Sequence, residues 1–162
     1  MTHFNSTLIA LLTVCFGMAS GIFFLLFCLE KPIYSLVLQK KANSSDHDTL
    51  MRRVLLVLQQ FLRFKVPTVM VTLIVSGTLG SAFRLAIYGF DSLPVIVAIS
   101  SFFIIVYSAF LVPPAIKMFE NVSLQASADE IQVALAPIVR LHRDVGFLVA
   151  VTLILHLTST FF

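Results

Sequence analysis

The chain ends in VRLHRDVGFLVAVTLILHLTSTFF, an apolar run with a histidine near each end, His142 and His156. On a helix, this spacing of 14 residues places the two about 40° apart around the axis and about 21 Å apart along it. They share a face, but they are too far apart to ligate one metal ion. Imidazole is a good ligand for haem iron or copper. The sequence therefore predicts a cofactor or metal held by His156, with His3 or another group opposite it, and His142 is a separate candidate for cofactor binding.

Each histidine also has a structural interpretation. His142 lies in RLHRD, a charged cluster where it would be solvated, and His3 would be solvated near the terminus. His156 lies deeper, where a hydrogen bond between helices would satisfy it. His47 falls in the polar stretch NSSDHD, and we expect no ligand role for it.

Other chemistry has little support in the sequence. Glu30 and Arg84 are placed at the edges of apolar runs, where long side chains reach water. The chain has no phosphate loop, no pair of cysteines at zinc spacing and no acid–base–nucleophile set. Cys15 and Cys28 would lie about 20 Å apart on a helix, too far for a disulfide, so we interpret them as packing residues.

The composition predicts an integral membrane protein. Hydrophobic residues make up 59% of the chain and charged residues 12%, with a mean hydropathy of +1.00. A chain of 162 residues cannot bury that much apolar surface in its own core, so the surface must face lipid. The net charge of +3 does not indicate nucleic-acid binding, because the basic residues flank apolar runs.

Four apolar runs predict an all-α integral membrane protein, a bundle of four transmembrane helices forming one membrane domain. Each run is long enough to cross about 30 Å of hydrocarbon as a helix. The first is expected to be a retained span because no Lys or Arg precedes it. Pro113 and Pro114 are expected to end the third span. The expected spans cover residues 7–29, 66–83, 93–116 and 145–162.

The basic residues predict the orientation. Ten of the eleven Lys and Arg residues fall in the first and third connections, and only Arg84 falls in the second. Connections rich in Lys and Arg stay in the cytoplasm. We therefore expect both termini outside the cytoplasm, in a protein of the bacterial inner membrane.

Two further helices are expected at the cytoplasmic side. An amphipathic helix is predicted over residues 49–65, TLMRRVLLVLQQFLRFK. At helical spacing, its basic and polar residues fall on one face and its leucines on the opposite face. It would lie on the membrane surface or extend the second span, from which Pro67 separates it. Ser127 followed by Glu130 fits a capping box that begins a short helix before the fourth span.

Small residues predict where the spans pack closely. They occur as Gly17 and Gly21 in the first span and as Gly77 and Gly80 in the second. The fourth span offers Gly146 and Ala150, and the third a looser set around Ser101 and Ser108.

The layout resembles small bacterial four-span membrane proteins of the copper-resistance D-like and HemJ-like kind, over about two thirds of the chain. The resembling stretches are MRRVLLVLQQFLRFKVPTVMVTLIVSGTLG, YSAFLVPPAIKM and VRLHRDVGFLVAVTLILHL. HemJ-like proteins are haem-associated membrane oxidases of porphyrin synthesis, with a His inside the first span and Trp nearby. This chain has no His inside its first span and no Trp.

Three functions follow as hypotheses. The first is a membrane oxidoreductase that binds haem b or copper. The second is a non-catalytic subunit or assembly factor that binds a membrane-protein partner or a second copy of itself. The third is a small transporter with a site near SGTLGS.

Overall fold

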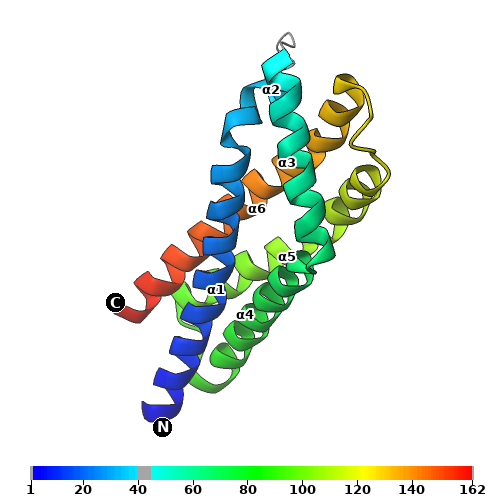
Figure 1. Cartoon of the computed structure of the whole chain (residues 1–162). Helices are drawn as coiled ribbons and strands as arrows, with labels where there is room; N and C mark the ends of the chain where they lie inside the picture. Colours follow the sequence, from blue (N-terminus) through cyan, green and yellow to red (C-terminus); the bar gives the residue numbers. More distant parts are fainter. Residues whose placement is uncertain (1, 40–44, 162) are drawn as a thin grey trace.

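Helices make up almost all of the part of the chain that the computed structural model describes, residues 2–39 and 45–161 (Figure 1). No strand occurs in these two ranges. The elements are α1 (Thr2–Glu30), a single 3-10 turn (Lys31–Ile33), α2 (Tyr34–Gln39), α3 (Ser45–Arg63), α4 (Val66–Tyr88), α5 (Ser92–Glu120) and α6 (Ala128–Phe161).

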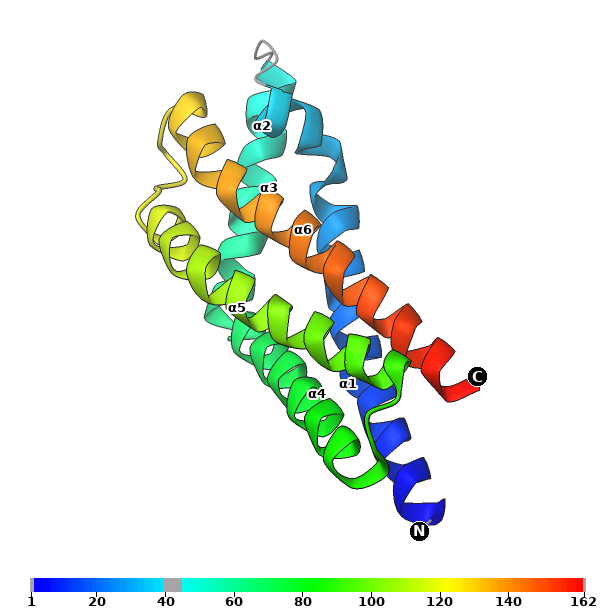
Figure 2. The same cartoon turned by 180° about the vertical axis from the view of Figure 1, so that it is seen from behind.

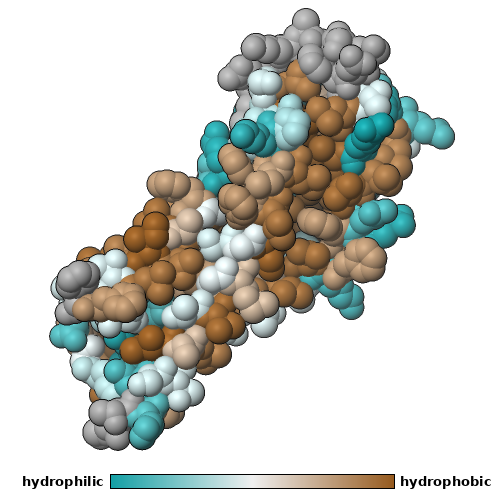
Figure 3. Space-filling view, turned by 60° about the vertical axis from the view of Figure 1, so that its left-hand side comes forward, coloured by the Kyte–Doolittle hydropathy of each residue, from teal (hydrophilic) through white to brown (hydrophobic). Residues whose placement is uncertain are grey.

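Four of these helices, α1, α4, α5 and α6, are long and apolar enough to cross a membrane. They form a ring in which α1 packs on α4 and α6, and α5 completes the ring between α4 and α6. Both termini lie at one end, which we call the terminal end (Figures 1 and 2). The opposite end, which we call the basic end, holds α2, α3 and the connection from α5 to α6. Hydrophobic side chains cover the middle of the molecule, and hydrophilic ones gather towards its ends (Figure 3).

The predicted spans lie within these helices, which run further than the apolar runs alone. Residues 7–29, 66–83 and 93–116 fall inside α1, α4 and α5, and residues 145–161 fall inside α6, whereas Phe162 lies outside the described residues. The short helix expected before the fourth span is instead the beginning of α6 itself. The capping box is confirmed: the backbone N of Ser127 donates to Glu130 Oε2 at 2.8 Å, and the backbone N of Glu130 donates to Ser127 Oγ at 3.4 Å.

The amphipathic helix is α3, and it continues into α4 with a bend (Figures 1 and 2). Lys65 adopts a left-handed conformation at the bend, with φ 56°, and Pro67 stands in the first turn of α4. The apolar face of α3 is buried against the rest of the bundle through Met51, Leu55 and Leu58. Its leucine face therefore joins the protein core instead of facing lipid.

The third span does not end at Pro113 and Pro114, contrary to the sequence prediction. α5 continues through both residues to Glu120. Each proline removes one backbone donor, but the turns beyond are held because Ala115 and Phe119 are buried in the core. Packing energy thus outweighs two missing hydrogen bonds.

Close packing occurs at the small residues of α4 and α6 but not at those of α1. A Cβ placed on Gly77 would lie 2.8 Å from the ring of Phe16, and one on Gly146 would lie 3.1 Å from Phe23 Cβ. Nothing lies within 4 Å of a Cβ placed on Gly17 or Gly21. The prediction for the first span is therefore wrong in its residues: α1 offers large side chains, which fill the space left by glycines on its neighbours.

Candidate functional site

In the described part of α1 and α6, the buried Glu30 and the half-buried His142 form an acid–base pair. Glu30 Oε1 lies 2.5 Å from His142 Nδ1, and the side chains are 0% and 16% exposed. Both sequence expectations for these residues are wrong, because Glu30 does not reach water and His142 is not solvated. The pairing explains the difference, since a buried carboxylate is tolerated when a hydrogen-bonding partner meets it.

Local packing positions the pair. Gly146, one turn after His142, lets α6 approach Phe23 of α1 closely. The ring of Phe23 then meets the His142 ring edge to face, with centroids 6.3 Å apart. The close approach of α1 and α6 at this level brings the end of α1, and with it Glu30, to the imidazole.

More polar groups follow His142 directly along α6, near the middle of the bundle. Tyr107 donates to Asp144 Oδ2 at 3.2 Å, and Arg143 Nε donates to Asp144 Oδ1 at 2.7 Å. Glu30 Oε2 and the Tyr34 hydroxyl are buried without a hydrogen-bond partner among the described residues. Orphaned buried oxygens of this kind ordinarily bind ordered water.

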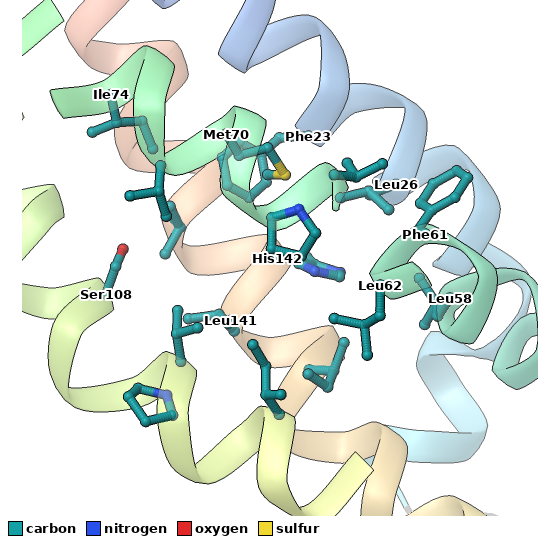
Figure 4. A pocket seen from close by; sticks show the side chains of 18 of the residues that line it. Phe23, Leu26, Leu58, Phe61, Leu62, Met70, Ile74, Ser108, Leu141 and His142 are labelled. Atoms are coloured by element: carbon teal, nitrogen blue, oxygen red, sulfur yellow. The ribbon is translucent and has the colours of Figure 1, made fainter. Parts of the chain in front are cut away.

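On its other side, His142 lines an apolar cavity of about 310 Å³ between α3, α4, α5 and α6, with α1 closing the back. Figure 4 shows the His142 ring projecting among Phe23, Met70 and Leu62. The volume is at the lower end of the range for small-molecule sites. Because Nδ1 is engaged by Glu30, Nε2 is the nitrogen left for a ligand.

The lining of this cavity has only two polar side chains, those of His142 and Ser108. Ser108 lies on α5, across the cavity from His142 (Figure 4). Its hydroxyl makes no hydrogen bond within the ranges that the structure describes. An apolar pocket with a few placed polar groups is the usual form of a small-molecule site.

His156 occupies a different site near the terminal end. It is 0% exposed, and its Nε2 lies 3.0 Å from Thr13 Oγ1 on α1. Thr13 also donates to the Ile9 carbonyl at 2.9 Å, and the Phe16 ring lies 6.0 Å from the imidazole. Nδ1 of His156 has no partner among the described residues. The hydrogen bond between helices that the sequence suggested is therefore present.

The structure does not bring the predicted ligands together. His3 is exposed at the beginning of α1, and the side chain of His47 lies outside the described residues. Within the described chain, no group of three or more His, Cys, Asp and Glu residues is placed to hold a metal ion. Sequence analysis missed Glu30, Met70 and Ser108. Their roles depend on the register between helices, which no local pattern records.

The arrangement combines an imidazole oriented by a carboxylate with a water-poor, apolar space. Such an imidazole can ligate iron, accept or donate a hydrogen bond, or exchange a proton with a bound molecule. Comparison with known proteins found no matching family model, curated protein or solved structure.

Proposed function

We propose that the chain is a small integral membrane protein of the bacterial inner membrane with a redox role, acting through a cofactor held at His142. Both termini lie outside the cytoplasm in this proposal, because the basic end carries most of the Lys and Arg residues. The observation that carries the proposal is the 2.5 Å contact between Glu30 and His142 at the wall of an apolar cavity.

The carboxylate supports a ligand role for the imidazole. Histidines that bind metals commonly donate their second ring N–H to a carboxylate, which fixes the tautomer and increases the basicity of the ligating nitrogen. Glu30 stands in that position, with its oxygen at Nδ1 of His142. His142 therefore replaces His156 as the favoured ligand, because the Nε2 of His156 faces Thr13.

The number of nitrogen and sulfur donors in the cavity suits haem b better than copper, but no lining residue is a Lys or Arg that could pair with the haem propionates. His142 would hold the haem iron, and Met70 is the other side chain of the lining whose sulfur could bind it. His142 of α6 and Met70 of α4 both line the cavity. Copper sites commonly use three or more His, Cys or Met ligands. When bound, haem supplies one-electron chemistry at its iron, while the apolar walls exclude water from it.

The test is an absorption spectrum and a metal analysis of the protein, purified after expression with haem supplied. The proposal expects a Soret band in the wild type that is lost in His142→Ala and kept in His156→Ala. If the Soret band is lost in His156→Ala but kept in His142→Ala, the iron ligand is His156 and not His142. Absence of both a Soret band and bound copper in the wild type would overturn the proposal and favour the non-catalytic subunit.

A further inference from the structure

The cavity beside His142 has an opening whose position determines what can enter. Most of its lining is buried or half-buried, but Val71 on α4 and Ala109 and Pro113 on α5 are exposed. These three residues lie on adjacent helices of the ring. All three belong to helices that are apolar enough to cross a membrane. In the proposed membrane-spanning arrangement, the opening between α4 and α5 faces hydrocarbon and not water.

We propose that the cavity binds an amphipathic molecule dissolved in the bilayer, which enters sideways between α4 and α5 and hydrogen-bonds through oxygen atoms to His142 and Ser108. This ligand would occupy the same cavity and the same His142 Nε2 as the cofactor of the proposed function, so the two exclude each other, and the inference is tested without haem. It names a class of ligand: an apolar body of ring or chain carbon with carbonyl or hydroxyl oxygens at one end.

The lining argues for this class. Apart from Ser108 and His142 it consists of apolar side chains, so a charged or strongly hydrated ligand would lose its water without compensation. A purely hydrocarbon ligand would leave the Ser108 hydroxyl and His142 Nε2 facing carbon. A ligand with an oxygen-bearing head can hydrogen-bond to both Ser108 and His142. Its carbon body makes apolar contacts with the rest of the lining.

Among the Ser and Thr residues of α4 and α5 that are not exposed, Ser108 differs because its hydroxyl makes no hydrogen bond in the described chain. Thr72, Thr78 and Ser81 each donate to the carbonyl four residues earlier, at 2.9 Å. Ser100 meets Thr152 of α6 at 2.5 Å. Ser108 makes no such bond in the described chain, although it faces a space that two other helices also line. Its hydroxyl is therefore available for a ligand.

The chain lacks Trp, so a single introduced Trp can report on the cavity. Phe61→Trp places the reporter in the lining, and Phe102→Trp places a matched one on the exposed face of α5, where the native ring is 62% exposed. Each protein is reconstituted in lipid nanodiscs, without added haem, and titrated with a benzoquinone that carries a decyl chain. This probe quenches Trp fluorescence and belongs to the proposed class.

The proposal expects saturable quenching of Phe61→Trp beyond the collisional quenching seen for Phe102→Trp. Adding Ser108→Ala should weaken the apparent affinity by about three- to tenfold, since one hydrogen bond is lost. Ser76→Ala, at an exposed serine of α4 outside the lining, should leave it unchanged. Equal quenching of the two reporters would overturn the binding site, and an unchanged affinity in Ser108→Ala would overturn the polar contact.

A third reporter, Ala109→Trp, tests the opening. Brominated acyl chains in the nanodisc should quench it strongly, and aqueous iodide should not. Quenching by iodide alone would place the opening in water and overturn entry from the bilayer. A protein that lacks a Soret band after haem supply yet binds the quinone would contradict the proposed cofactor and leave this inference standing.

Discussion

Glu30 and His142 are 112 residues apart in the chain, yet the carboxylate of the one lies 2.5 Å from the imidazole of the other. The contact joins the end of α1 to the middle of α6. His142 also lines the apolar cavity, and Asp144, two residues further along α6, accepts a hydrogen bond from Tyr107 of α5. Structure and proposed chemistry therefore depend on the same pair.

Removing one member of this pair should destabilise the fold. Glu30→Ala leaves the imidazole buried without its partner, and we expect a loss of about 3 kcal/mol in the free energy of unfolding. Unfolding by sodium dodecyl sulfate in mixed micelles measures it. Glu120→Ala, at an exposed acid on the end of α5, is the control and should be close to neutral.

The same pair can be tested by a double-mutant cycle. Glu30→Ala combined with His142→Ala should cost clearly less than the sum of the two single changes, because each single change already removes the contact. Additive costs would show that the two side chains do not interact.

Gly77 should not tolerate a methyl group. Its added Cβ would meet the buried Phe16 ring at 2.8 Å, so Gly77→Ala should cost about 1–3 kcal/mol through overpacking. Gly21→Ala, where nothing lies within 4 Å, should be neutral or slightly stabilising, because Ala is the better helix former. The same unfolding titration compares the two, and equal effects would contradict the packing of α1 on α4.

The hydrogen bond between Thr13 and His156 should contribute less to the free energy of unfolding than the contact between Glu30 and His142. Thr13→Val keeps the shape of the side chain but removes the oxygen that meets His156 Nε2 at 3.0 Å. Hydrogen bonds between helices in membranes contribute about 0.6 kcal/mol on average, and we expect a loss of that order. Thr72→Val, at an exposed threonine that bonds only within its own helix, is the matched control.

The proposed orientation predicts the behaviour of fusion proteins. Alkaline phosphatase, which is active only outside the cytoplasm, should be active when fused after the last residue. It should be inactive when inserted between Asn121 and Ser127, in the connection at the basic end. The reverse pattern would overturn the orientation and place the basic end on the outer side.

The sequence predicted the helices well because hydrophobic runs and basic flanks are local properties. It was wrong where a long-range contact decides the outcome. Pro113 and Pro114 look like a helix end until Ala115 and Phe119 are seen buried beyond them. The sequence predicted Glu30 as a solvated residue at the edge of a span, whereas in the fold it contacts the imidazole of His142 on α6.

One feature of the histidine sites could be predicted from the sequence. His156 was expected to need a partner on another helix, and Thr13 is that partner. Nothing in α1 alone indicates that Glu30 faces residue 142, and nothing in α5 alone indicates that Ser108 faces a cavity. These facts depend on which residues of neighbouring helices stand at the same level.

The most direct test of the account is chemical rescue at position 142. His142→Gly, purified with haem supplied, should lack the Soret band of the wild type and regain it when free imidazole is added. His156→Gly should keep the band without imidazole. A wild-type spectrum in His142→Gly without imidazole would contradict the assignment of His142 as the functional ligand.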